Sequence, residues 1–158
     1  MAVRVGQGFD VHPFVEDADR PLVLGGVVFA SDRALGGHSD ADVIAHACAD
    51  ALLGAAGLGD IGEHFPDTDP TWAGADSVGL LAEVARRVRA AGWVPGNVDA
   101  SVVTDHPKLA PARDEIQQRL SAAVGAPVTV KGRRPEGLGA LGRGEGVACW
   151  AVAVVTQP

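Results

Sequence analysis

Hydrophobic and polar positions follow a helical rhythm most clearly between residues 38 and 51. Apolar side chains recur there at the spacing of one buried stripe: Val43, Ile44, Ala47 and Ala51. Polar side chains recur every four residues on another face: Asp42, His46 and Asp50. We therefore predict a helix that Ser39 caps and in which Asp42 or Asp50 accepts the second ring N–H of His46. A solvated Asp/His/Asp face is the alternative.

Residues 1 to 12 have the pattern of an extended strand, which Pro13 is expected to close. Asp10 and His12 are two residues apart, so their side chains point to the same side of that strand. With the helical imidazole of His46 they make a three-ligand set with an open fourth position, which is typical of a catalytic zinc site. The alternative is that Asp10 caps a turn at Pro13 while His12 is solvated.

The rest of the chain alternates between strand and helix patterns. Two short apolar runs around a Gly-Gly pair predict a hairpin over residues 21–29. Periodicity predicts helices over residues 77–91 and 112–124, and strands over 98–104, 128–131 and 147–155. The stretch from Ala55 to Pro70 is rich in Gly, Pro and carboxylates, and we expect an ordered binding loop there. Three arginines of the second helix are expected to be solvated: Arg86, Arg87 and Arg89.

His38 comes just before the first predicted helix. The free N–H groups and the positive dipole end of a helix start favour an anion. We therefore interpret His38 as a phosphate contact, with an ordinary surface-loop histidine as the alternative.

Composition sets outer limits on these interpretations. With 158 residues, 47% of them hydrophobic, the chain fits one domain over residues 1–158 with a real core. A net charge of −7 argues against a nucleic-acid partner. No run approaches the roughly 20 apolar residues of a membrane span, and no leader pattern opens the chain, so we expect a cytoplasmic protein without membrane contact. Cys48 and Cys149 have no paired spacing and are expected to be free, buried thiols.

Seven segments, in order along nearly the whole chain, resemble those of the 2-C-methyl-D-erythritol 2,4-cyclodiphosphate synthase family. They are Gly8–His12, His38–His46, Gly59–Gly62, Phe65–Pro70, Gly74–Ser77, Pro107–Leu109 and Gly142–Gly146. The resemblance implies an α+β domain with a mixed sheet, helices on one face, and a homotrimer whose sheets pack together and whose active sites lie between subunits. It also implies a phosphorus–oxygen lyase of the non-mevalonate isoprenoid pathway. Such an enzyme cyclises 4-diphosphocytidyl-2-C-methyl-D-erythritol 2-phosphate and releases CMP.

The resemblance also implies a role for each matching residue. Asp10, His12 and His46 would bind zinc or another divalent transition metal, and Glu136 would help to hold Mg²⁺ or Mn²⁺ on the substrate diphosphate. His38 and Arg134 stand at the catalytic positions. The implied substrate-binding set is Asp10, His12, His38, Ser39, Asp60, Ile61, Gly62, Phe65, Asp67, Thr104, Lys108, Leu109, Ala110, Arg133, Glu136, Ala140 and Arg143.

One segment departs from the family pattern. Arg133-Arg134-Pro135 stands where the family usually has a run of threonines, and Gly137 and Ala140 stand where a lysine and an aromatic residue are common. An arginine fork can bind phosphate bidentately, whereas its bulk beside a proline can block the nucleotide. The alternative function is therefore a diverged member that acts on another diphosphate or only binds its ligand.

Overall fold

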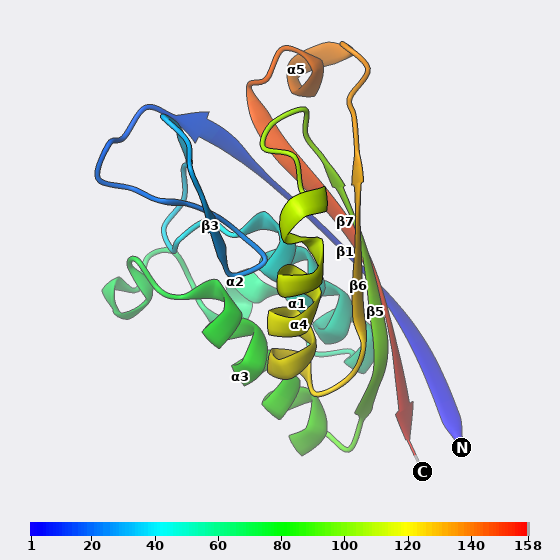
Figure 1. The fold of residues 1–158 in the computed structure, drawn as a ribbon. Coiled ribbons are helices and arrows are strands. Elements are labelled where there is room, and N and C mark those ends of the chain that lie inside the picture. The colour runs from blue at the N-terminus through cyan, green and yellow to red at the C-terminus, as the bar shows by residue number, and fades with distance from the viewer. Residues whose placement is uncertain (158) are drawn as a thin grey trace.

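Five strands form one mixed sheet on one side of the molecule (Figure 1). The structure is a computed structural model, and it describes residues 1–157. The strand order is β4 (Ala34–Leu35), β1 (Ala2–Val15), β7 (Gly146–Gln157), β5 (Val94–Val103) and β6 (Val128–Arg133). Only β5 and β6 are parallel, and the other neighbours are antiparallel. The predicted mixed sheet is confirmed.

Three long helices lie on the same side of this sheet (Figure 1). Helix α1 (Val43–Ala56) packs on β1 and β7, α4 (Arg113–Val124) packs on β6, and α3 (Ser77–Ala90) packs against both helices. Short helical turns complete the described chain: α2 (Ile61–His64), η1 (Pro70–Trp72), η2 (Ala110–Ala112) and α5 (Gly139–Gly142). None of the helices in residues 1–157 is long and apolar enough to cross a membrane.

Helix α1 lies directly on β1 because the strand carries glycine where the two elements meet. A Cβ at Gly6 would lie 2.1 Å from the Ala51 carbonyl oxygen, and one at Gly8 would lie 1.9 Å from the Ala47 carbonyl oxygen. The helix presents alanine to the strand at these points, which also permits close approach. Asp10 follows Gly8 on the same strand face. This contact therefore brings the predicted strand ligands next to the helix that carries His46.

The predicted hairpin is confirmed as β2 (Leu22–Leu24) and β3 (Val27–Phe29), which are antiparallel. Gly25 and Gly26 form its turn with φ of 59° and 77°, a region that favours glycine. Their N–H groups donate to the Asp42 carboxylate at 2.8 and 2.7 Å. Asp42 also accepts from Ile44 N and is the N-cap of α1. The prediction that Ser39 caps this helix is therefore wrong, and the helix begins four residues after it.

Other predicted boundaries also differ, and β5, β6 and β7 are each longer than predicted. Strand β1 does not end at Pro13 but continues to Val15, because Pro13 still accepts from Gly36 N at 2.9 Å and Phe14 N donates to the Glu145 carbonyl oxygen. The expected binding loop from Ala55 contains the end of α1 and all of α2, since the Asp60 side chain accepts from Glu63 N and starts a helical turn.

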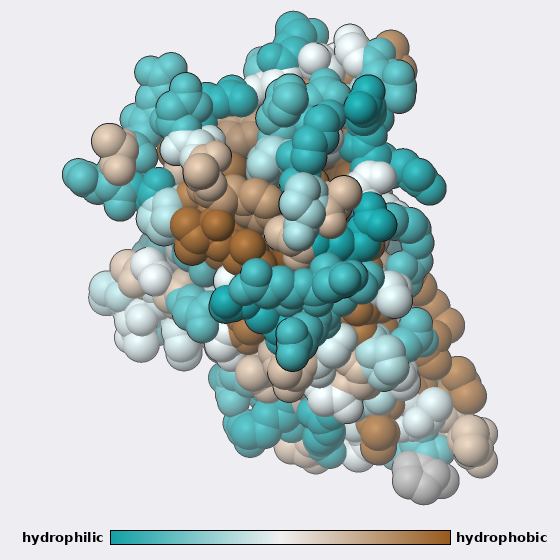
Figure 2. Space-filling view, in the orientation of Figure 1, coloured by the Kyte–Doolittle hydropathy of each residue, from teal (hydrophilic) through white to brown (hydrophobic). Residues whose placement is uncertain are grey.

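The other face of the sheet is apolar where β1 and β7 form it, and no helix of residues 1–157 covers that part. On β1 and β7 it exposes Val3, Val5, Phe9, Val11, Trp150 and Val152. Val5 is 65% exposed, and the Phe9 and Trp150 rings meet across the strand pair with centroids 4.8 Å apart. In Figure 2, hydrophobic side chains accordingly appear along the edge of the molecule where β1 and β7 lie in Figure 1. Cys48 and Cys149 are free and buried, as predicted.

Candidate active site

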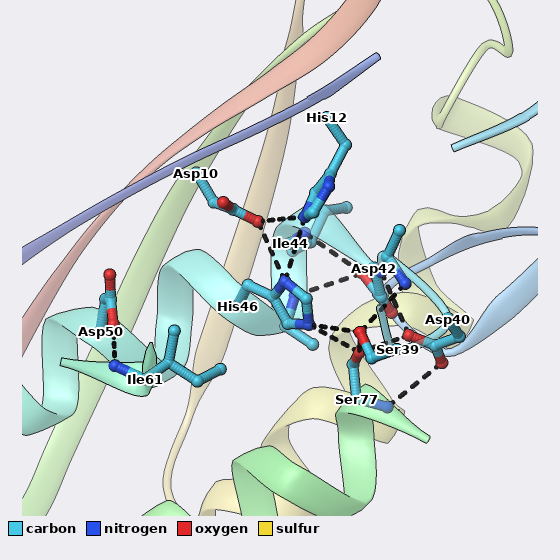
Figure 3. Close-up of polar contacts among 12 residues, drawn as sticks. Asp10, His12, Ser39, Asp40, Asp42, Ile44, His46, Asp50, Ile61 and Ser77 are labelled. Carbon is cyan, nitrogen blue, oxygen red and sulfur yellow. Dashed lines mark hydrogen bonds and ion pairs between the residues drawn. The ribbon is translucent and has the colours of Figure 1, made fainter. Parts of the chain in front are cut away.

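The side chains of Asp10, His12 and His46 converge at one point between β1 and α1 (Figure 3). Asp10 Oδ2 lies 2.9 Å from His12 Nε2 and 3.0 Å from His46 Nδ1, and the two ring nitrogens are 3.2 Å apart. The predicted convergence of two strand residues with one helix residue is therefore confirmed. The alternatives of a turn cap at Asp10 and a solvated face around His46 are excluded.

In each imidazole, the ring nitrogen that points away from the centre makes a hydrogen bond. His12 Nδ1 lies 2.8 Å from the Gly36 carbonyl oxygen, which only accepts, so Nδ1 carries the proton and Nε2 has its lone pair toward the centre. His46 Nε2 contacts the hydroxyl oxygens of Ser77 and Ser39, at 2.8 and 3.1 Å. His46 Nδ1 therefore also faces the centre.

Neither carboxylate expected to orient His46 does so. Asp42 is fully buried and accepts backbone N–H groups of the hairpin and of α1, and burial raises its pKa although those hydrogen bonds oppose the rise. Asp50 accepts from Ile61 N at 2.7 Å. Burial raises the pKa of Asp50 too, against the Ile61 hydrogen bond, and the nearby Asp60 adds to the rise. The prediction that Asp42 or Asp50 orients His46 is wrong, because both carboxylates accept hydrogen bonds from backbone N–H groups instead.

The electrostatics of the centre favour a cation. Burial alone would raise the pKa of Asp10, yet hydrogen bonds and charge from His12 and His46 outweigh it and hold that pKa below its usual value. Burial lowers the pKa of His12, but Asp10 outweighs this and the net shift is upward. Two imidazole nitrogens and one carboxylate oxygen at a partly exposed point fit a divalent transition metal with an open position.

A cavity of about 430 Å³ opens beside this centre. Six further residues of the predicted substrate set line it: His38, Ser39, Ile61, Gly62, Phe65 and Asp67. His38 Nε2 lies 2.9 Å from the Asp69 carbonyl oxygen, to which it donates. Asp60 is not among the lining residues. The sequence interpretation missed Trp72, whose ring meets Phe65 edge-on with centroids 4.9 Å apart.

A second cavity of about 160 Å³ contains most of the remaining set. The lining residues that we predicted are Thr104, Lys108, Leu109, Ala110, Arg133 and Arg134. Arg113, which we did not predict, also lines it, so four cationic side chains surround one small cavity. They come together because the parallel strands β5 and β6 end side by side. A net charge of −7 gave no hint of this cluster.

The two cavities share no lining residue. Within residues 1–157 of one chain, the predicted substrate set is therefore divided between two places. Glu136, Ala140 and Arg143 lie exposed around α5 and line neither cavity. Arg143 instead pairs with Glu145, with Nε and Oε2 2.7 Å apart.

The second-helix arginines are not all solvated, contrary to expectation. Arg87 Nε donates to Glu83 at 2.8 Å, and its Nη1 lies 2.7 Å from His64 Nδ1. Its guanidinium also lies over the Phe65 ring, 4.9 Å from the centroid. Arg89 donates to the Val124 carbonyl oxygen at 2.6 Å. Arg87 therefore supports a wall of the first cavity.

Comparisons with known proteins all indicate one family. The profile of the YgbB family matches residues 3–156. The chain is 53% identical over 157 residues to the 2-C-methyl-D-erythritol 2,4-cyclodiphosphate synthase of Bordetella petrii, covering 98% of this chain and 96% of that protein. It is 53% identical over 156 residues to the synthase of the same name from Salinibacter ruber, covering 97% and 98%.

Solved structures give the same result. The bifunctional IspDF of Campylobacter jejuni matches with a TM-score of 0.93 and 39% identity over 99% of this chain, which corresponds to 43% of that longer chain. The CDP complex of IspF from Plasmodium falciparum matches with a TM-score of 0.84 and 31% identity, over 99% of this chain and 97% of the other.

Proposed function

Because the chain belongs to the family of 2-C-methyl-D-erythritol 2,4-cyclodiphosphate synthases, we propose that it cyclises 4-diphosphocytidyl-2-C-methyl-D-erythritol 2-phosphate and releases CMP. The observation that carries this proposal is the Asp10/His12/His46 centre, with both imidazoles held by outer hydrogen bonds, at the mouth of a cavity. The enzyme is accordingly a phosphorus–oxygen lyase of non-mevalonate isoprenoid biosynthesis. Neither the site nor the comparisons favour the alternative of a diverged or non-catalytic member.

The first cavity suits the methylerythritol phosphate part of the substrate. Asp10, His12 and His46 would hold zinc or a similar ion, which when bound neutralises and polarises phosphate oxygens. The hydrogen bond from His38 Nε2 to the Asp69 carbonyl oxygen would orient the ring beside the 2-phosphate, and the Ser39 hydroxyl would contact the same group. The ring closes within one molecule, so the residues here act mainly by orientation and charge neutralisation.

The second cavity suits the cytidine diphosphate part. Its four cations favour phosphate oxygens, and the guanidinium of Arg134 can form two parallel hydrogen bonds to one phosphate. Thr104, Leu109 and Ala110 supply the smaller polar and apolar wall of a base pocket. Glu136 would contribute to a Mg²⁺ or Mn²⁺ ion on the diphosphate, because hard cations prefer carboxylate oxygens.

A homotrimer would bring the two parts together. No other element of residues 1–157 covers the apolar sheet face around Phe9 and Trp150, and exposed patches of this kind mark contact surfaces. Since one substrate must contact both cavities, the second cavity of a neighbouring subunit would complete the first. Arg143 and Glu145, exposed beside this end of the sheet, would lie near the subunit contact.

The direct test is incubation of the purified protein with this substrate, zinc and magnesium, followed by phosphorus NMR. We expect the signals of a cyclic diphosphate together with CMP. Metal-loaded, folded protein that yields neither product would contradict the proposal. Screening of other nucleotide diphosphates would then identify the substrate of a diverged enzyme.

A further inference from the structure

We propose that Ser77 and Asp40 form a positioning relay for His46, in which the Ser77 hydroxyl donates to Asp40 and accepts the Nε2–H of the imidazole (Figure 3). In the described part of the chain, neither residue forms a hydrogen bond with Asp10 or His12. The relay rests on the metal centre of the proposed function, but it concerns metal binding rather than turnover.

The relay is built from a buried hydroxyl and a carboxylate on separate segments. Ser77 is the first residue of α3 and is 1% exposed, and its Oγ lies 2.8 Å from His46 Nε2. Asp40, in the loop before α1, accepts from both the hydroxyl and the backbone N–H of Ser77. Asp40 N in turn donates to the Ala75 carbonyl oxygen at 3.0 Å. The carboxylate is therefore held against the start of α3.

The direction of each hydrogen bond follows from the number of protons. A serine hydroxyl has one proton, and a carboxylate can only accept. Ser77 therefore donates to Asp40, and its oxygen is left to accept from His46 Nε2–H. This assignment selects the tautomer with the lone pair on Nδ1, which is the nitrogen that faces Asp10 and His12.

Ser39 cannot replace this arrangement. Its Oγ is farther from His46 Nε2, at 3.1 Å, and it also accepts from Ala41 N at 3.2 Å. Ser39 Oγ is 3.3 Å from Ser77 Oγ, and no carboxylate is among its hydrogen-bond partners in the described residues. Ser77 is thus the primary acceptor of the imidazole proton, and the negative charge of Asp40 strengthens it. An outer partner of this kind fixes ring orientation and raises ligand basicity.

The test measures metal binding without substrate. In Ser77→Ala we expect the zinc Kd, from chelator competition, to rise about 10- to 100-fold. The visible spectrum of the Co²⁺-loaded protein should shift as well, because the ligand ring loses its fixed orientation. Asp40→Asn should give a smaller rise, since an amide oxygen still accepts from Ser77 but lacks the charge. Ser77→Thr should restore most of the affinity.

The matched control is Asp76→Asn, which alters the N-cap carboxylate of the same helix. Asp76 accepts from Val78 N at 3.1 Å and has no link to His46. We expect zinc affinity to stay unchanged and the melting temperature to change little, because asparagine caps a helix about as well as aspartate. Zinc binding by Ser77→Ala at wild-type strength, an equal loss in Asp76→Asn, or a wild-type protein that binds no zinc would overturn the relay. Zinc-loaded wild type that fails to cyclise the substrate would overturn only the proposed function.

Discussion

Arg20 is a single side chain that holds the loop carrying His38 and Ser39. Its Nε donates to the Leu35 carbonyl oxygen at 2.6 Å, and its Nη2 donates to the carbonyl oxygens of Gly37, at 2.9 Å, and Ser39. One guanidinium thus satisfies three backbone acceptors on the cavity side of β4. An ammonium group lacks this planar fork, so lysine is not an equivalent replacement.

We expect Arg20→Met to raise KM for the substrate by about tenfold, because the loop no longer presents His38 and Ser39 in one geometry. Arg20→Lys should recover only part of the loss. Steady-state kinetics with measured melting temperatures will check this. Arg86→Met is the control, since Arg86 is exposed and, among residues 1–157, its ion-pair partner is Glu83 alone. A KM for Arg20→Met equal to that of the control would refute the role.

Arg134 stands where the family resemblance leads us to expect a threonine. It lines the second cavity with three other cations, so we expect it to bind the diphosphate. Arg134→Thr should raise KM about tenfold with a smaller change in kcat, because a charge-assisted hydrogen bond to phosphate is lost. Kinetics on the cyclisation reaction will measure this. A higher kcat/KM in the variant would mean instead that the arginine hinders turnover.

Residue-level prediction succeeded where the signal was local. Asp10 and His12 share a strand face, and His46 stands on a helix with clear periodicity, so the convergence of these three side chains was predictable. Ser77 was not, because it lies 31 positions from His46 and no spacing connects them. The predicted role of Asp42 as a partner of His46 was wrong, because a carboxylate near a helix start is equally suited to cap that helix. The backbone N–H groups of residues 25 and 26, which bind Asp42 instead, are distant in the sequence.

At the level of elements, the contact between β1 and α1 determines the geometry of the site. Gly8→Ala places a Cβ against the backbone of Ala47 and must push the helix away from the strand. We expect unfolding free energy to fall by about 2 kcal/mol or more, as overpacking usually costs. Zinc affinity should fall too, because His46 moves with the helix. Urea denaturation and chelator competition will measure both effects.

Gly54, on the part of α1 that lies next to Gly6 and Gln7, gives the control. A Cβ at Gly54 would meet only Gln7 O and Gly6 Cα, at 3.7 and 4.0 Å, which is ordinary contact. Gly54→Ala should therefore stabilise the protein by about 0.5–1 kcal/mol, because helical glycine costs backbone entropy. Equal destabilisation by both substitutions would show that the interface tolerates neither methyl group. The close strand contact would then not be specific to Gly8.

Most elements were predictable in kind, but their ends were not. Periodicity identified the long helices and four of the five sheet strands, and it missed the short strand β4. The start of α1 depended on which of several polar residues accepts the free N–H groups, and the structure selects Asp42 over Ser39. The glycines of β1 gave no periodic signal, although they permit the approach that builds the site. Such contacts involve residues about 40 positions apart, so no local pattern predicts them.

At the scale of the whole molecule, the two cavities of one chain are separate, which predicts that each active site is shared between two subunits. If each site combines the first cavity of one subunit with the second cavity of another, two differently damaged chains can repair each other. We consider His46→Ala, which removes a metal ligand, and a variant in which Arg133 and Arg134 are both alanine. Each variant alone should be nearly inactive.

Co-assembled in equal amounts, these two variants should recover about a quarter of wild-type activity. In a symmetric ring with random order, about one site in four combines an intact first cavity with an intact second cavity. Mixing without subunit exchange is the control and should recover nothing. Trp150→Asp, which puts a charge on the apolar sheet face, should abolish both the assembly and the recovery, as sedimentation velocity will show. Val28→Asp, at a 65% exposed position on the separate hairpin, should leave both intact. If each chain contained its own complete site, every mixed assembly would stay inactive, since each subunit carries one defect.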